Sequence, residues 1–156
     1  MKRIALITAL LATLAAAVPA SGAVLLAKNC TSNCSNVQAK GNGWLSVVGN
    51  GAEWGNLQSG TIWVRDRTGN TDPKRSDWVS GRGLTWKSIG DDGWKVTSKS
   101  PMSFSASTKS FWIKLQGPGI QVSGVFVGSG AIAGNGKYAI NSHTHSWPTH
   151  ATDLHF

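Results

Sequence analysis

The stretch that most constrains the fold is residues 102–127, where apolar and polar side chains alternate. The apolar positions within it include Phe111, Ile113, Leu115, Ile120 and Val122. A period of two is typical of a β-strand that buries one face. Residues 116–119, with the sequence Gln-Gly-Pro-Gly, interrupt the alternation. Because glycine and proline favour tight turns, the pattern predicts a hairpin of two strands joined by that loop.

Glycine pairs punctuate the rest of the chain. Gly-x-Gly recurs at residues 41/43, 49/51, 81/83, 117/119, 128/130 and 134/136. Short strand-like runs lie between these pairs, at residues 44–48, 61–66, 84–89, 94–98, 102–106, 110–115, 120–127, 131–133 and 137–141. Glycine supplies the positive φ that turns and bulges need. With no helical period after residue 23, the chain is predicted to be all-β, a single-domain antiparallel β-sandwich or barrel of about 8–10 short strands.

The first residues resemble an export signal. A basic start, Met1-Lys2-Arg3, is followed by an apolar run over residues 4–18 and then by small residues. This order is typical of a secretory signal peptide, which we assign to residues 1–23. The chain is therefore predicted to be secreted or extracytoplasmic. Once the signal is removed, no transmembrane anchor is expected.

The remaining chain divides into three parts. Residues 24–40 show no periodicity and predict a flexible leader, residues 41–148 form the all-β domain, and residues 149–156 form a C-terminal tail. The leader contains Cys30 and Cys34, the two cysteines of the chain. In an oxidising compartment we expect them to pair as a disulfide that closes a small loop.

The chain is basic, with a formal net charge of +8, and its basic residues are scattered and do not form a run. A basic exported protein is attracted to anionic partners such as acidic glycans and cell-envelope polymers. The alternative interpretation is that the charge only keeps the protein soluble. Scattered charges do not predict a specific nucleic-acid site, and we expect a monomer.

The eight tryptophans suggest a platform on which sugars could stack. Alternation with neighbouring aliphatic residues places two of them on the polar face of a strand, Trp63 beside Arg65 and Trp112 beside Lys114. These four residues are the predicted ligand-binding set, for a polysaccharide or an anionic envelope polymer. The alternative is that both indoles are partly buried, or are covered by Arg65 and Lys114 through cation–π contacts.

All four histidines lie in the last fourteen residues. On an extended backbone His143 and His145 share one face, and His150 follows the Trp147-Pro148 turn. Zinc and copper both accept imidazole ligands, so the three histidines are candidate metal ligands. A metal-binding protein or a metal-dependent hydrolase is therefore the alternative function. A solvent-exposed tail without metal explains the same residues.

Catalytic residue types lack a recognisable arrangement. Asp91-Asp92-Gly93 is better explained as a hairpin turn than as a pair of catalytic carboxylates. There is no Gly-x-Ser-x-Gly motif and no unpaired cysteine beside a base. The sequence therefore favours a non-catalytic binding or structural module at the cell surface and predicts no cofactor apart from the zinc or copper alternative.

The region from Gly41 to Pro148 resembles a loose class of small exported bacterial proteins that are all-β, glycine-punctuated and without an assigned function. The resemblance is carried by the Gly-x-Gly pairs, by residues 61–66 (Thr-Ile-Trp-Val-Arg-Asp), and by residues 134–138 (Gly-Asn-Gly-Lys-Tyr) ahead of Trp147-Pro148. It implies an all-β fold of this style and brings no functional residue with it.

Overall fold

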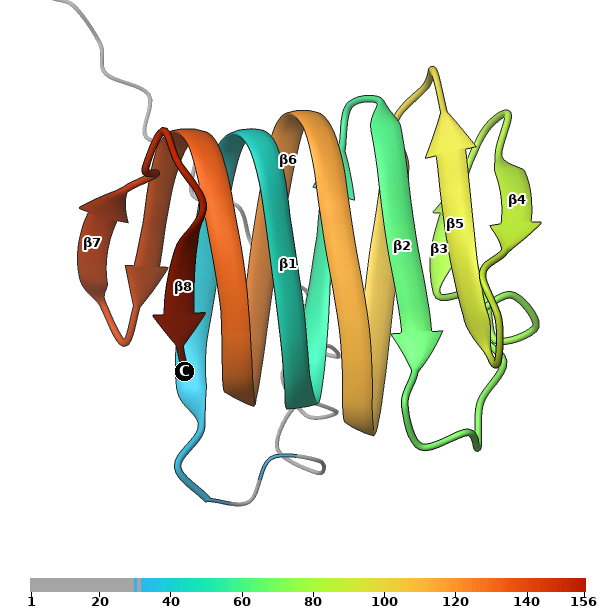
Figure 1. Cartoon of the computed structure of the whole chain (residues 1–156), viewed down its shortest axis with the longest axis horizontal. Coiled ribbons are helices and arrows are strands. Elements are labelled where there is room, and N and C mark those ends of the chain that lie inside the picture. The colour runs from blue at the N-terminus through green and yellow to red at the C-terminus, as the bar shows by residue number, and fades with distance from the viewer. Residues whose placement is uncertain (1–29, 31) are drawn as a thin grey trace, which may run out of the picture.

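The computed structural model describes residue 30 and residues 32–156, which form eight β-strands (Figure 1). The strands are β1 (Ser35–Leu57), β2 (Gly60–Asp66), β3 (Val79–Gly81), β4 (Thr85–Ser88), β5 (Gly93–Ser98), β6 (Met102–Ile140), β7 (His143–Ser146) and β8 (Thr152–His155). Every pairing between them is antiparallel and these residues contain no helix, so the predicted all-β antiparallel fold is confirmed. The predicted signal peptide lies outside the described residues. In the part of the chain that is described, no helix is long and apolar enough to cross a membrane.

β1 and β6 are two long antiparallel strands that wind around each other. Leu45 of β1 pairs with Leu115 of β6 on one side and with Ile132 of β6 on the other. The segment of β6 between these two partners therefore makes one turn of a flattened coil. Figure 1 shows both ribbons bending over at the top of the molecule, from the side facing the viewer to the side behind.

The coil flattens into two layers, which makes the fold a sandwich. The front layer contains, in order, β8, residues 128–133 of β6, 44–49 of β1, 111–116 of β6, β2, β5 and β4. The rear layer contains β7, residues 136–140 of β6, 35–41 of β1, 120–126 of β6, 51–57 of β1, 102–108 of β6, and β3. The sheet does not close on itself, which decides for a sandwich and against a barrel.

Four of the five glycine pairs within β1 and β6, at residues 41/43, 49/51, 117/119 and 134/136, span corners of the coil and do not form hairpins, and the fifth, 128/130, directly follows a corner. Leu115 pairs with Leu45, and Ile120 pairs with Gly41, so the hairpin predicted at residues 116–119 is wrong. β6 carries one extra residue at this corner, and such a bulge bends a strand. Pro118 fits there because a bulged position does not require the backbone N–H that proline lacks. Its carbonyl oxygen accepts a hydrogen bond from the backbone N–H of Gln58 at 3.2 Å.

Close approach between successive turns of the coil explains why these corners need glycine. Gly43 has a φ of +136°, and a Cβ there would collide with the carbonyl oxygen of Ala133 in the neighbouring turn. A residue with a side chain rarely adopts that φ and would also push the two turns apart. The glycines thus let the backbone change layers without losing its neighbour.

Both ends of the domain extend further than the sequence predicted. Val37 and Ala39, assigned to the flexible leader, are buried residues of β1. Leu154, assigned to the tail, is buried in β8. The ring of Phe156 packs edge-on against Phe126 at 4.9 Å between centroids. These short apolar segments contribute to the core only because β6 offers each of them a strand to pair with.

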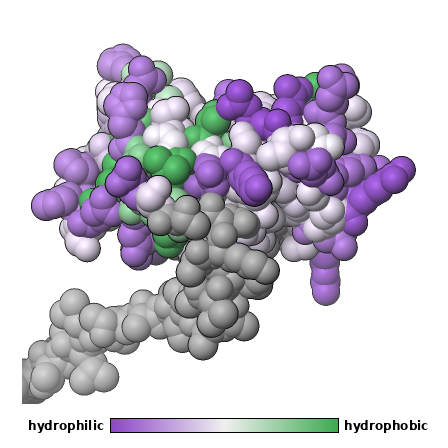
Figure 2. Space-filling model, turned by 90° about the horizontal axis from the view of Figure 1, so that it is seen from below, coloured by the Kyte–Doolittle hydropathy of each residue, from purple (hydrophilic) through white to green (hydrophobic). Residues whose placement is uncertain are grey.

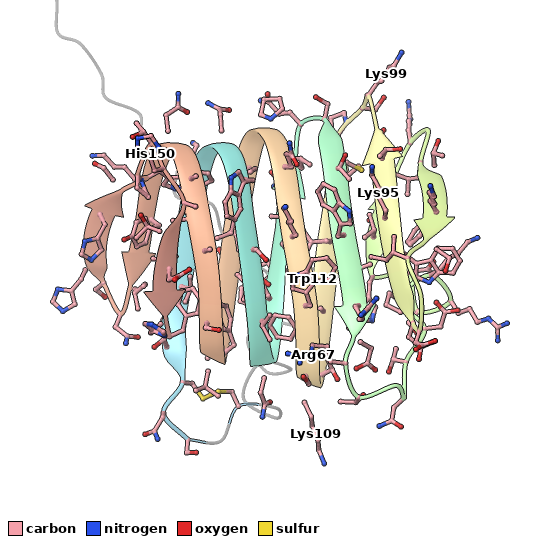
Figure 3. All side chains as sticks on the ribbon, viewed as in Figure 1. Arg67, Lys95, Lys99, Lys109, Trp112 and His150 are labelled. Carbon is pink, nitrogen blue, oxygen red and sulfur yellow. A yellow bond between two sulfur atoms is a disulfide. The ribbon has the colours of Figure 1, made fainter. Side chains whose placement is uncertain are left out.

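Cys30 and Cys34 form a disulfide immediately before β1. The disulfide lies at the lower end of the sandwich (Figure 3), the end shown in Figure 2. In that view hydrophilic side chains project around the rim, and hydrophobic residues are visible between them.

The core lies between the two layers and is built from the inward positions of both. Its largest fully buried side chains include Phe111, Phe126, Leu57, Ile62 and Met102. Glu53 is the exception among them, because its side chain is 1% exposed and neither carboxyl oxygen has a hydrogen-bond partner. Its neighbours across the strands are the small residues Ala106 and Gly124. Burial raises the pKa of Glu53 from 4.5 to about 8.

Candidate binding face

The candidate site is the outer face of the front layer. Ile62 and Val64 of β2 are buried in the core, while Trp63 between them is half-buried on the outside. Trp112 of β6 is likewise half-buried on the outside, and its indole nitrogen donates a hydrogen bond to Ser46 Oγ at 3.1 Å. Figure 3 shows Trp112 on the face that looks toward the viewer. Strand alternation therefore sorted these two indoles correctly.

Strand register brings the four predicted ligand-binding residues together. β2 and β6 are neighbours, with Trp63 opposite Lys114 and Arg65 opposite Trp112. The four side chains thus occupy two adjacent cross-strand pairs on one face. Side chains that are directly opposite in an antiparallel pair are close enough to interact.

Two further residues belong to the same surface but were missed from the sequence. The ammonium group of Lys114 lies 5.2 Å from the ring centroid of Trp44 and 5.2 Å from that of Trp63. Lys95 lies on β5, the neighbour of β2 on the side away from β6, and its ammonium group is 5.5 Å from the ring centroid of Trp63. Alternation of Trp44 with buried Leu45 could have found the first of these residues.

We call this surface the Trp–Lys patch, and it consists of Trp44, Trp63, Arg65, Lys95, Trp112 and Lys114. Along it, indoles and ammonium groups alternate from β1 to β5. Of the cation–π contacts expected from Arg65 and Lys114, the contact of Lys114 with Trp63 is present. The other contacts in the patch are those of Lys95 with Trp63 and of Lys114 with Trp44. Each indole nonetheless remains partly exposed on the open face of the sheet.

The charged residues of the patch are all basic. Within the front-layer segments of β1, β6, β2 and β5 that carry the patch, and within β4 beside them, the only acidic residue is Asp66, which is 2% exposed and lies on the core side. Burial raises the pKa of Asp66, but hydrogen bonds from Thr68 and Thr71 outweigh burial and hold the pKa below its usual value. Asp66 is therefore an ionised structural group at the end of β2.

Arg65 also has a structural role. Its guanidinium donates a hydrogen bond to the carbonyl oxygen of Ile89 at 2.9 Å. It lies where a side chain at Gly93 would otherwise be, since a Cβ at Gly93 would come within 2.8 Å of Arg65 Nε. Lys95 and Lys114 are thus the cations of the patch with the greater freedom to meet a ligand.

The other tryptophans serve the structure or lie elsewhere. Trp78 and Trp147 are buried. Trp86 and Trp94 pack edge-on at 5.9 Å, and the Trp94 indole nitrogen donates to Asp72 at 2.8 Å. Trp54 is half-buried on the rear layer, next to Ser105 and Ser123 in the register. It is a natural control for the patch.

A shallow depression of about 240 Å³ lies beside the lower end of β2. It is lined by both basic and acidic side chains and by one glycine: Arg65, Asp66, Arg67, Gly69, Asp91 and Asp92. Asp66 is already engaged by hydrogen bonds from Thr68. Asp91 and Asp92 line the depression from the turn between β4 and β5.

The candidate metal ligands are divided between two places. His143 and His145 lie on edge strand β7, whereas His150 lies in the connection between β7 and β8 (Figure 3). Among the described residues, no group of three or more His, Cys, Asp or Glu side chains is arranged to hold a metal ion.

The fold and the patch together define an all-β sandwich with one aromatic and basic outer face. Comparisons with protein-family models, with curated proteins and with solved structures gave no match. The assignment of function therefore depends on the geometry of the chain itself.

Proposed function

We propose that the chain is an exported, non-catalytic binding module whose Trp–Lys patch binds an anionic carbohydrate polymer of the cell envelope. The observation that carries this proposal is the alternation of Trp44, Lys114, Trp63 and Lys95 across four adjacent strand segments. Acidic polysaccharides present the matching alternation of apolar sugar faces and carboxylate groups.

The chemistry of each partner supports this choice. The face of an indole stacks against the C–H face of a pyranose ring, and it also attracts a cation. The ammonium groups of Lys95 and Lys114 are already held beside the rings, so a carboxylate can reach them without ordering new side chains. An open sheet face also suits an extended polymer better than a small ligand, which is normally enclosed in a pocket.

A binding role is favoured over a catalytic one by the placement of the acids. Glu53 is buried in the core, and Asp66 is held by hydrogen bonds at the end of β2. The patch itself offers no general acid or base to a bound sugar. The Cys30–Cys34 disulfide and the predicted signal peptide support export, because disulfides persist in oxidising compartments.

The test uses the chain from residue 24 onward, without a tag, titrated calorimetrically with polygalacturonate and, in parallel, with dextran as a neutral polymer. We expect binding of polygalacturonate alone, with a change in tryptophan fluorescence. Trp63→Ala and Lys114→Gln should each weaken binding about tenfold, which corresponds to about 1.4 kcal/mol. The matched controls on the rear layer, Trp54→Ala and Lys40→Gln, should bind like the unaltered chain.

Two results would remove the proposal. One is the absence of binding across a broad panel of acidic glycans. The other is an equal loss of binding in the front-layer and rear-layer variants, since this would mean that the patch is not the binding surface.

A further inference from the structure

Edge strand β7 holds two histidines on one uncovered side. His143 pairs with Ile140 of β6, and His145 pairs with Tyr138. Tyr138 and Ile140 face the core side of the rear layer, so both histidines lie on that side too. They are nevertheless exposed. Figure 1 shows the reason, because β7 stands outside β8 at the edge of the sandwich and the front layer does not cover it.

The two imidazoles are free to act as ligands. Neither forms a hydrogen bond or an ion pair within the described residues. The ring of His145 stacks on Tyr138, with 5.1 Å between centroids and 25° between planes, which limits its orientation. Lys137 is adjacent to Tyr138 on β6 and pairs with Ser146, so its side chain lies on the face of the sheet opposite to that of His143 and His145.

One copy of the chain supplies only half of a typical site. Zinc usually takes four ligands, and copper also prefers several nitrogens. No third histidine, cysteine or carboxylate joins His143 and His145 among the described residues. β7 pairs with β6 on one side only, so its other edge carries unpaired backbone groups. An open strand edge is a template for pairing with another chain.

We propose that a zinc or copper ion binds between two copies of this chain and is held by His143 and His145 of each copy. The two β7 strands pair antiparallel about a two-fold axis at Thr144. In that register His143 of one copy lies opposite His145 of the other. Opposite Cβ atoms are about 5 Å apart, and residues two apart on a strand are separated by about 7 Å. Four imidazoles then surround one ion at metal–nitrogen distances of about 2 Å.

The test is sedimentation together with calorimetric titration of ZnCl₂ into the untagged chain from residue 24 onward. We expect one ion bound for every two chains, a doubling of mass, and reversal of both by EDTA. The double variant His143→Gln with His145→Gln should lose metal binding and the mass change. The matched control, His150→Gln with His155→Gln, should keep both.

Several outcomes would overturn the proposal: no zinc bound by the unaltered chain, one ion bound per chain without a mass change, a dimer that persists in EDTA, or zinc-dependent doubling in the His143/His145 variant. Circular dichroism separates these results from misfolding. Both histidines are exposed, so their replacement should leave the spectrum unchanged. The inference does not depend on polymer binding by the Trp–Lys patch, which lies on the outer face of the front layer.

Discussion

The ammonium group of Lys114 lies 5.2 Å from the ring centroid of Trp63, directly across the β6–β2 pair. A cation over the face of an indole at a partly exposed site stabilises a protein by about 0.5–1 kcal/mol. A double-mutant cycle of Trp63→Ala and Lys114→Gln, followed by urea unfolding, should show a coupling energy of that size. A control cycle of Trp54→Ala with Lys114→Gln joins residues in opposite layers and should show no coupling.

Polymer binding through the Trp–Lys patch should depend on salt. The contacts of Lys95 and Lys114 with carboxylates are partly exposed, and the screening length falls from about 10 Å at 0.1 M salt to about 3 Å at 1 M. We expect the affinity for polygalacturonate to fall as NaCl is raised and the effect of Lys114→Gln to shrink with it. Trp63→Ala should cost a similar factor at all salt concentrations, because stacking is less sensitive to screening.

Lys109 provides the matched control for that series. It projects from the lower end of the molecule, away from the patch (Figure 3). Lys109→Gln removes the same charge, so it should lower the affinity only slightly. If it weakens binding as much as Lys114→Gln does, net charge and not the patch would explain the attraction.

The faces of the strands could be predicted from the sequence because alternation is a local property. Trp63 and Trp112 were placed outside for this reason, and the Asp91–Asp92 turn was found because it joins neighbouring strands β4 and β5. Asp92 has a φ of +47°, as a tight turn requires.

The pairing partners could not be predicted, because they are distant in sequence. Nothing in residues 111–127 indicates that 111–116 pair with β1 and β2, or that 120–126 pair with β1 on both sides, and that the two segments do not pair with each other. A Gly-x-Gly pair has the same local sequence whether the chain reverses or only turns a corner. For the same reason the short apolar segments around Val37 and Leu154 were assigned to a leader and a tail. Four of the six residues of the Trp–Lys patch were predicted. Trp44 and Lys95 were missed because β1 and β5 were not known to lie beside β6 and β2.

Glycine at the corners of the coil should be far less replaceable than glycine in an ordinary turn. Gly43→Ala introduces a Cβ that collides with Ala133 at an unfavourable φ of +136°, so we expect a loss of about 3 kcal/mol or failure to fold. Gly83 is the matched control, because it also has a positive φ of +63° but nothing lies within 4 Å of its added Cβ. Gly83→Ala should cost about 1 kcal/mol. Equal losses in urea unfolding would contradict the role given to the corners.

Buried Glu53 should make the protein less stable as the pH rises. Its pKa is about 8 in the folded chain against 4.5 as the ordinary value, so the folded state holds a proton that the unfolded state has already released. The stabilisation is complete below pH 4.5 and is lost progressively up to pH 8. Since one pKa unit corresponds to about 1.4 kcal/mol, the total loss is on the order of 5 kcal/mol.

The pH dependence can be assigned to Glu53 by comparing the unaltered chain with Glu53→Gln between pH 5 and pH 8. Asp66 and Asp72 have lowered pKa values, so their contributions are present throughout this window and disappear only in more acidic solution. The glutamine variant cannot ionise, so its free energy of unfolding should fall less steeply than that of the unaltered chain. The difference between the two proteins should therefore grow in favour of the variant by up to about 1.4 kcal/mol for each pH unit. A difference that stays constant with pH would mean that Glu53 is solvated or paired in solution.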